Sequence, residues 1–549
     1  FLILRLLFTK PFKEVLSLYI SRKHLAAVLV FALAALTFTL CYSFLISGSI
    51  KPDILSIEDP VQCDLLIKKG TIVDGSGKAS YRADIAVEGD KIVRIGSFPA
   101  EAGRVIDAEG LVIAPGFINP HSHIDQTIIE DPDARASLLQ GVTTEIIGLD
   151  GLSPLDLDKH FAKISQNGIG INYGSLIGQG SIRQAVIGND PRPATKEEIA
   201  SMKALIKRAM EQGAFGLSTG LEYIPGKYTP TGEIIELARA VTPFKGVYVS
   251  HIRSEGDRVV EAVKEALQIG RSAGIPAVIS HIKVGSSIYD ASREELIAKK
   301  TGEVMAAINE YRETGGEAYA DIYPYIVSWF QINKHPEQVV WNYPGKLVLV
   351  SSASRENYIG KTVAEIAVEE NISPAAVAGK LAADPKALVC LQNLSETSMR
   401  RLLKAPFTVI GMDNTIYWGD PSYIPPKHPR NAGTYPRVLG EYVRSNKVLT
   451  LEEAIYKMTG MTAEIYGIDR RGLIKEGFFA DFVIFDPDKI QDKATYWEPD
   501  LPPVGIEYVL VNGQIAVKKG NLVRTDSNKG AQGIRAGVII RQNFLIENP

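Results

Sequence analysis

Hydrophobic residues follow two patterns along this chain. Short strand-like runs occur towards both ends, and strand-like runs alternate with helical spacing in the middle. Short apolar runs broken by Gly and Asp are typical of antiparallel strands joined by tight turns. Such runs occur at Asp64–Ile67, Thr71–Val73, Ala83–Val87 and Lys91–Ile95, and again at Phe482–Phe485, Ile506–Val511 and Gln514–Val517. We expect these two separated stretches to form one small β-sandwich.

In the middle of the chain, strand patterns alternate with helical ones. Helical spacing of apolar residues is clearest in Lys196–Gln212, Arg258–Ile269 and Glu294–Tyr311. The predicted strands are Leu111–Pro120, Thr144–Leu149, Ile169–Ile177, Ala214–Ser218, Gly246–Ser250, Ala277–Ser280, Glu317–Ala320 and Phe407–Met412. This alternation predicts an α/β fold of the TIM type, a (β/α)8 barrel, whose active-site groups lie at the carboxyl ends of the strands.

These patterns divide the chain into domains. We expect the first part of the sandwich at residues 60–118, the barrel at 119–460, the second part of the sandwich at 461–530 and a tail at 531–549. The stretch 329–406 is too long for one helix between two strands. We therefore expect it to form a small helical insertion over the mouth of the barrel.

Residues 1–50 have the pattern of a cytoplasmic N-terminus followed by a membrane anchor. Leu25–Ile46 contains no charged residue, and as a helix it would span about 33 Å, enough for a bilayer core of about 30 Å. Arg22 and Lys23 precede it, so the positive-inside rule predicts a single-pass membrane protein with an extracytoplasmic catalytic domain. A cleaved signal peptide is the alternative.

Composition narrows the class of protein further. The 549 residues are 45% hydrophobic and 22% charged, which is ordinary for a globular protein and excludes a disordered chain. The net charge of −3, with no basic stripe interleaved with aromatic residues, predicts no nucleic-acid partner. Three cysteines are too few for a disulfide-rich scaffold.

Histidine and aspartate follow the ends of the predicted strands. They are His121, His123, Asp150, His251, His281, Asp321 and Asp413. Side chains alternate along a strand, so the His-x-His pair places both rings on one side. Imidazole and carboxylate together are ligands that borderline divalent metals favour. The pattern therefore predicts a site for one or two divalent ions, with zinc as the metal that these ligands suit best.

Several motifs carry a resemblance to a known family. The run Ala114–His123, with the sequence APGFINPHSH, resembles the metal motif that opens the barrel in the amidohydrolase superfamily. More narrowly, the chain resembles N-acyl-D-amino-acid deacylases (D-aminoacylases) over residues 62–525. The matching segments are Gly141–Thr144, Gly216–Tyr223, Tyr248–Arg253, Ile279–Lys283, Asp321–Tyr325, His428–Arg430 and Lys457–Thr459.

The resemblance implies a metal-ligand set. His121 and His123 would hold one metal position, His251 and His281 the other, and Asp150 would bridge the two. In the family the position of Asp150 is usually a cysteine. Aspartate is a harder ligand that can bridge two ions, so the number and identity of the metals are the points on which this chain departs from the family.

The resemblance also implies roles around the substrate. Asp413 would be both a metal ligand and the proton carrier, Tyr223 would polarise the carbonyl oxygen, and Lys283 and Arg430 would bind the substrate carboxylate. The implied reaction is hydrolysis of the amide bond of an N-acyl-D-amino acid by a metal-activated water.

Two other functions are open at this point. One is an amidohydrolase of cyclic amides, such as a hydantoinase or dihydroorotase. Those enzymes use a carboxylated lysine on the fourth strand, where this chain has Gly216–Ser218 and no lysine. The other is a non-catalytic, membrane-anchored binding protein, which the intact ligand set disfavours.

Arg253 and Glu255 are expected to form a salt bridge at the barrel rim.

Overall fold

The computed structural model describes residues 37, 59–125, 127–285, 293–331, 344–384, 386–392, 394–414, 428–525 and 532–542. The chain divides into two compact units, Phe1–Pro60 and Val61–Pro549. The second unit contains the elements that the sequence analysis assigns to the sandwich and the barrel, and it is the part described below.

The prediction of a single-pass membrane protein is wrong. In the portion of the chain that the structure describes, no helix combines the length and the apolar character needed to cross a bilayer. The predicted span Leu25–Ile46 lies outside the described residues, apart from Thr37. An extracytoplasmic placement of the catalytic region, which rested on that span, falls with it.

Two β-sheets combine strands from both ends of the second unit. The first has the order β5-β4-β1-β6, and the second has the order β23-β22-β21-β20-β7-β2-β3. The bounds are β1 Val61–Lys68, β2 Thr71–Ile72, β3 Tyr81–Arg82, β4 Asp84–Glu88, β5 Lys91–Gly96, β6 Ala100–Asp107, β7 Val112–Pro115, β20 Phe482–Phe485, β21 Ile506–Val511, β22 Gln514–Lys518 and β23 Asn521–Leu522. Leu65 and Ile85 of the first sheet share one buried core with Ile113, Phe482 and Leu510 of the second. The sheets therefore face each other as a sandwich.

The strands of the central region are parallel and lie in two further sheets, β10-β9-β8 and β11-β12-β13-β14-β15-β19. Their bounds are β8 Phe117–Asn119, β9 Val142–Ile147, β10 Asn172–Ser175, β11 Ile177–Gly178, β12 Gly216–Gly220, β13 Val247–His251, β14 Ala277–Ile279, β15 Ala318–Ile322 and β19 Thr408–Ile410. Within the described strands, no continuous ladder joins the two sheets. The structure thus has the predicted α/β alternation, and the described strands give two parallel sheets without a ladder that closes them into one barrel.

The first predicted strand, Leu111–Pro120, is in fact two strands. β7 belongs to the sandwich and β8 to the parallel sheet, and Gly116 separates them. A Cβ atom at Gly116 would lie 2.2 Å from the Thr143 side chain, so the chain passes too close to β9 for any larger residue. This break lets one apolar run serve both parts of the fold.

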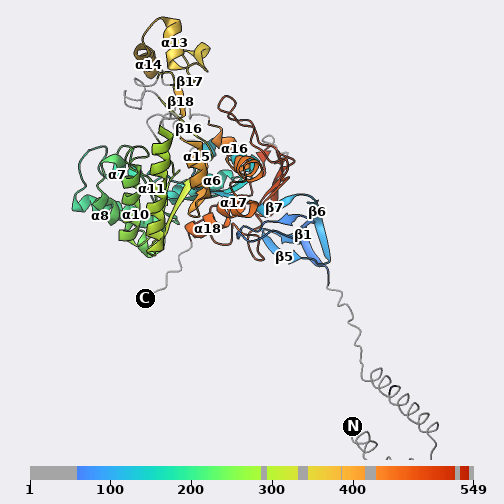
Figure 1. The fold of residues 1–549 in the computed structure, drawn as a ribbon. Coiled ribbons are helices and arrows are strands. Elements are labelled where there is room, and N and C mark those ends of the chain that lie inside the picture. The colour runs from blue at the N-terminus through green and yellow to red at the C-terminus, as the bar shows by residue number, and fades with distance from the viewer. Residues whose placement is uncertain are drawn as a thin grey trace, which may run out of the picture. The chain divides into compact units, whose positions relative to one another are not determined.

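Helices separate the parallel strands, and several have strong N-terminal caps. Thr195 and Glu198 form a capping box at α8, and Thr450 and Glu453 form another at α17. The helix bounds are α4 Thr127–Glu130, α5 Arg135–Leu139, α6 Leu157–Asn167, α7 Gln179–Val186, α8 Lys196–Glu211, α9 Thr231–Ala238, α10 Val259–Ala273, α11 Glu294–Glu313, α15 Glu396–Lys404, α16 Arg430–Arg437, α17 Leu451–Met458 and α18 Gly460–Tyr466. Figure 1 shows α7, α8, α10 and α11 together on one side of the parallel strands.

The expected helical insertion is a mixed α/β element. It contains a sheet of order β16-β18-β17, made of β16 (Val327–Gln331), β17 (Val348–Ser351) and β18 (Leu388–Gln392). Helices α13 (Val363–Glu370) and α14 (Pro374–Ala382) pack against it in a small core of their own (Figure 1). Short apolar runs such as that of β18 fit a strand or a buried helix equally well, which is why periodicity alone did not reveal the sheet.

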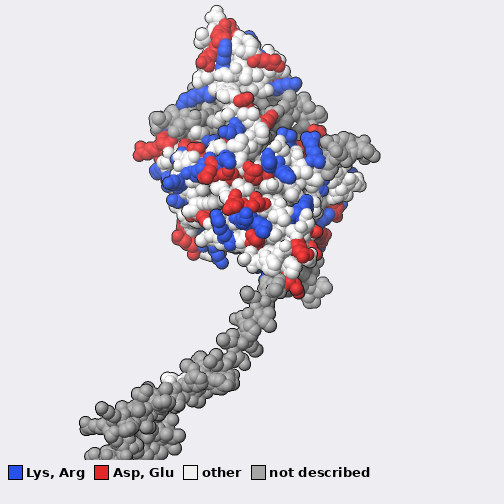
Figure 2. Space-filling model, turned by 90° about the vertical axis from the view of Figure 1, so that its right-hand side faces the viewer, with Lys and Arg blue, Asp and Glu red and all other residues white. Residues whose placement is uncertain are grey.

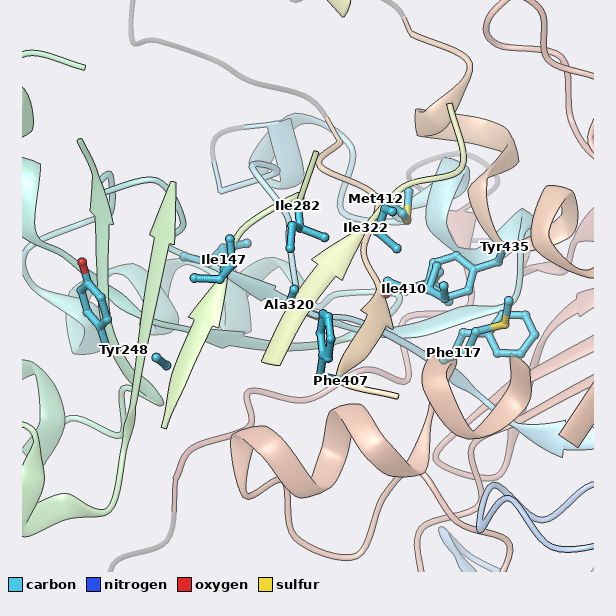
Figure 3. Packing of buried hydrophobic residues seen from close by; sticks show 14 of the residues in the cluster. Phe117, Ile147, Tyr248, Ile282, Ala320, Ile322, Phe407, Ile410, Met412 and Tyr435 are labelled. Carbon is cyan, nitrogen blue, oxygen red and sulfur yellow. Dashed lines mark hydrogen bonds between the residues drawn. The ribbon is translucent and has the colours of Figure 1, made fainter. Parts of the chain in front are cut away.

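A buried aromatic pair ties the first and last parallel strands together. Phe117 stacks on Tyr435 with ring centroids 5.1 Å apart, as Figure 3 shows. The Tyr435 hydroxyl lies 2.8 Å from the Ile118 carbonyl oxygen and 3.1 Å from that of Ile410. The ends of β8 and β19, where His121 and Asp413 follow, are thereby held side by side.

Part of the predicted C-terminal tail packs against the parallel strands. The Tyr173 amide donates to Val538, and the Ile540 amide donates to Tyr173, each at 2.9 Å. Ile540 packs against the cluster that contains Phe215.

On the molecular face drawn in Figure 2, Lys and Arg side chains are interspersed with Asp and Glu.

Candidate metal centre

The candidate ligands lie at one edge of the parallel sheets. His121 and His123 follow β8, Asp150 follows β9, His251 ends β13, and His281 and Asp413 follow β14 and β19, respectively. Parallel strands end at the same edge of a sheet, so their C-terminal residues converge there. The structure brings all six predicted ligands together, in two groups that share Asp150.

The first group contains His121, His123, Asp150 and Asp413, all of which are buried. The Nε2 atoms of His121 and His123 are 3.3 Å apart. Asp150 approaches these two nitrogens at 3.6 Å and 3.4 Å, and Asp413 Oδ1 also lies 3.6 Å and 3.4 Å away. Four ligand atoms therefore face one small volume.

The second group contains Asp150, His251 and His281. His251 Nδ1 and His281 Nε2 face each other at 2.9 Å, and Asp150 Oδ2 lies 3.9 Å and 3.5 Å from them. Asp150 thus reaches both pairs of histidines, as the bridging position requires.

Three of the candidate ligands have left-handed backbones. The φ angles are +51° at Asp150, +33° at His281 and +50° at Asp413, a region that L-residues rarely adopt and that is often strained at functional sites. Gly148 lies two residues before Asp150 and has a φ angle of +82°. A Cβ atom at this position would lie 2.3 Å from the Leu176 carbonyl oxygen. The chain turns sharply at these positions and aims the side chains inward.

A divalent cation fits this arrangement of atoms. Among the described residues, Asp150 Oδ1 and Asp413 Oδ1 are buried without a hydrogen-bond partner, although buried polar atoms are normally satisfied. Burial alone would raise the pKa of Asp150, but His121 and His281 hold that pKa well below its usual value. Burial would also raise the pKa of Asp413, but the nearby charges, above all that of Arg430, hold this pKa below its usual value. Two ionised carboxylates and paired imidazole nitrogens are a ligand set for zinc-type ions.

The three predicted substrate-binding residues border the metal ligands. Arg430 Nη1 lies 2.7 Å from Asp413 Oδ2. The Tyr223 hydroxyl is 3.2 Å from His251 Nδ1, and Lys283 Nζ is 3.0 Å from His281 Nδ1. A narrow pocket adjoins His281 and Lys283, and its lining includes the apolar side chains of Ile322, Leu394 and Met399.

Sequence reasoning named Asp321 at a strand end without giving it a role, and it did not place Glu222 or Glu255 beside the histidines. The expected salt bridge between Arg253 and Glu255 is wrong, because Arg253 pairs with Glu265 at 2.9 Å. Glu255 instead lies 2.8 Å from His281 Nδ1, and Glu222 lies 3.4 Å from His251 Nε2. Asp321 lies 3.2 Å from His121 Nδ1; its place at a strand end was the one available signal, since loop geometry determines the other two contacts.

The fold and the site together define the class of protein. Histidine and aspartate side chains that converge at the carboxyl ends of parallel strands are typical of a metal-dependent hydrolase. The family model described as "Amidohydrolase family" matches residues 104–160 and 348–517. The chain is 34% identical to a D-aminoacylase of Alcaligenes xylosoxydans xylosoxydans over 84% of its length and 95% of that relative.

This protein belongs to the amidohydrolase family, among the relatives of D-aminoacylase. Solved structures agree. A crystal structure of D-aminoacylase matches with a TM-score of 0.75 at 30% identity, covering 87% of this chain and 100% of the other. An N-acyl-D-glutamate deacylase from Bordetella bronchiseptica, complexed with zinc and a phosphonate inhibitor, matches with a TM-score of 0.74 at 32% identity, covering 87% and 100%. The chain is therefore a metal-dependent amidohydrolase.

Proposed function

We propose that this protein hydrolyses N-acyl-D-amino acids to a carboxylic acid and a free D-amino acid. The observation that carries the proposal is the convergence of six ligands, one of which is Asp413, whose Oδ1 atom faces His121 and His123. The names of the relatives supply the substrate class, because those enzymes act on N-acyl-D-amino acids.

We propose that the site holds one or two zinc ions. His121 and His123 would hold one ion and His251 and His281 the other, and Asp150 is within reach of both pairs. The two unpartnered carboxylate oxygens and the facing nitrogens support this assignment. A bound divalent ion supplies a Lewis acid that lowers the pKa of a water ligand and polarises a carbonyl oxygen.

Asp413 is the proposed proton carrier. Its carboxylate takes a proton from the attacking water and delivers it to the leaving nitrogen, which cannot depart as an amide anion. Arg430 holds Asp413 Oδ2 at 2.7 Å, so Oδ1 remains directed at the histidine pair. The Tyr223 hydroxyl, next to His251, donates a hydrogen bond to the carbonyl oxygen as negative charge develops there.

Two cations are available to the substrate carboxylate. Arg430 uses Nη1 for Asp413, while its buried Nε has no hydrogen-bond partner among the described residues. Lys283 Nζ is paired with Glu255 at 2.7 Å and faces the ring of Tyr323, as Arg430 also does. An anion that enters between these two cations would satisfy the unpaired Nε donor.

We also propose that the parallel strands form a closed (β/α)8 barrel within residues 119–460, with an insertion at 329–406, and that residues 60–118 and 461–530 form the sandwich. Contacts between the two parallel sheets support closure. Ser122 and Asn414 form an isolated parallel bridge, and the Asp413 amide donates to the His121 carbonyl oxygen at 2.9 Å. Residues 531–549 are the proposed tail.

A panel of N-acetyl D- and L-amino acids, together with hydantoins, tests the function. Zinc-loaded protein should release free amino acid from D-substrates alone, and the Asp413→Asn variant prepared in parallel should release almost none. Ring opening of hydantoins without release from N-acetyl-D-amino acids would instead establish a cyclic-amide hydrolase. A metal-loaded protein that hydrolyses neither class would refute the proposal.

A further inference from the structure

Three of the four candidate histidine ligands have a carboxylate behind them. Each ring directs one nitrogen toward Asp150 and the other toward an acidic side chain. The distances are 3.2 Å from His121 Nδ1 to Asp321, 2.8 Å from His281 Nδ1 to Glu255 and 3.4 Å from His251 Nε2 to Glu222. None of these acids belongs to the two ligand groups that share Asp150.

A neutral imidazole has one protonated nitrogen and one free lone pair. A carboxylate can only accept a hydrogen bond, so the ring nitrogen that faces it carries the proton. The opposite nitrogen then presents its lone pair to the centre. A carboxylate behind a histidine therefore selects both the tautomer and the ring orientation that metal binding needs.

Each of the three acids is itself held in place. Asp321 is fully buried, and its second oxygen accepts the His281 amide at 2.9 Å. Glu222 accepts the Glu255 amide at 3.3 Å. Glu255 Oε1 receives both His281 Nδ1 and Lys283 Nζ, at 2.8 Å and 2.7 Å.

We propose that Asp321, Glu222 and Glu255 are positioning residues that fix the metal-binding tautomers of His121, His251 and His281. We further infer that Glu255 couples the metal centre to the substrate cation, because one oxygen serves both His281 and Lys283. This inference rests on the proposed function of the site. It assigns Glu222 and Glu255 to positioning, although their oxygens lie close enough to His251 to form a possible ligand group with it.

Zinc affinity of the metal-free protein is the decisive measurement, made by competition with a chromophoric chelator. Glu222→Gln, Glu255→Gln and Asp321→Asn are compared after the unfolding temperature of each variant has been checked. An amide can donate toward the ring and favour the wrong tautomer. Each variant should bind zinc about 10–100-fold more weakly.

Glu265→Gln is the matched control. The Glu265 side chain is 14% exposed against 18% for Glu255, and it pairs with Arg253 and Thr231 rather than with a histidine. Its zinc affinity should equal that of the unmodified protein. Lys283→Met should likewise keep zinc affinity, since Glu255 still accepts from His281, while the KM for an N-acetyl-D-amino acid rises.

The outcomes separate the inference from the function beneath it. Equal zinc affinity in the unmodified protein and in folded Glu255→Gln and Glu222→Gln would overturn the positioning role and leave the proposed function standing. Failure of the unmodified protein to bind zinc at all would overturn both. Weaker binding in these variants with an unchanged Glu265→Gln supports the inference, and a parallel rise in KM in Glu255→Gln supports the coupling to Lys283.

Discussion

Arg430 and Asp413 form an ion pair that assigns different surroundings to the two oxygens of one carboxylate. Oδ2 lies 2.7 Å from Arg430 Nη1, whereas Oδ1 lies 3.4 Å from His123 Nε2 and has no hydrogen-bond partner among the described residues. One oxygen is thus anchored by a permanent charge. The other is free for a metal ion or a proton in transit.

The Asp413→Asn variant should separate these two uses. Asn keeps the shape and one oxygen but is a poor base, and general acid–base groups contribute about 10²–10⁴-fold to rate. We expect kcat to fall by at least that range, while the metal held by His251 and His281 stays bound. Measuring kcat and metal content on one sample checks this. A near-normal kcat would reject the catalytic role, and loss of all metal would make Asp413 a structural ligand.

Removal of metal should abolish activity and lower stability together. A ligand present at 100 times its Kd stabilises the folded state by about 2.7 kcal/mol, so a chelator should lower the unfolding temperature as activity disappears. Zinc should restore both. His251→Ala, which removes one side of a group of three ligands, should lose the ion from that group. Full activity in a protein shown to be metal-free would contradict the proposed chemistry.

Tyr223→Phe tests the proposed oxyanion donor. The Tyr223 ring packs 4.5 Å from the His251 ring, centroid to centroid, and Phe preserves this contact while removing the hydroxyl. Loss of one oxyanion-stabilising donor typically lowers kcat about 10²–10³-fold. We expect that loss with unchanged zinc content and little change in KM. A kcat within a few-fold of normal would show that the hydroxyl does not act in the transition state.

Lys457 should make stability depend on pH at the opposite side of the fold. This buried side chain donates to the Ala405 and Thr408 carbonyl oxygens, and burial lowers its pKa from 10.5 to about 8. Between these values the unfolded chain binds more protons, so the free energy of unfolding rises with pH by about 1 kcal/mol per unit. The difference between the unmodified protein and Lys457→Met, measured in urea from pH 8 to 10, should show this rise. Parallel pH profiles would contradict it.

Asp481 should be critical for joining the sandwich to the parallel strands. It pairs with buried Arg471, accepts the Asn512 amide at 2.7 Å and accepts Asn172 Nδ2 at 3.0 Å. Removing one partner of a buried pair is expected to destabilise by about 3–5 kcal/mol. Asp481→Ala should therefore lower the urea midpoint strongly. Asp469→Ala, which breaks the half-exposed pair with Arg470, is the control and should have little effect.

Much of the site could be predicted because strand ends are visible in the sequence. His121, His251 and Asp413 each follow an apolar run, and parallel topology brings such positions together. The partner acids were not visible in this way. Glu255 lies shortly after His251 in sequence yet contacts His281 of the next strand, and a loop conformation decides that.

The fold was predictable in its alternation and less so in its boundaries. The apolar run from Leu111 to Pro120 gives no period change at Gly116, where the chain leaves one sheet for another. β18 within the insertion is likewise too short to differ from a helix by periodicity. For Leu25–Ile46, an uncharged run preceded by basic residues is not sufficient evidence of a membrane protein.

The order of strands in the sandwich also sets a limit on how early the chain can fold. β7 lies between β2 and β20, with Ala114 opposite Val483 and Pro115 opposite Phe482. Its neighbour on one side is made early in synthesis and its neighbour on the other side very late. Pairings so distant in sequence form slowly. A nascent chain that ends before β20 leaves β7 as an exposed sheet edge, so the sandwich is completed only after β20 has left the ribosome.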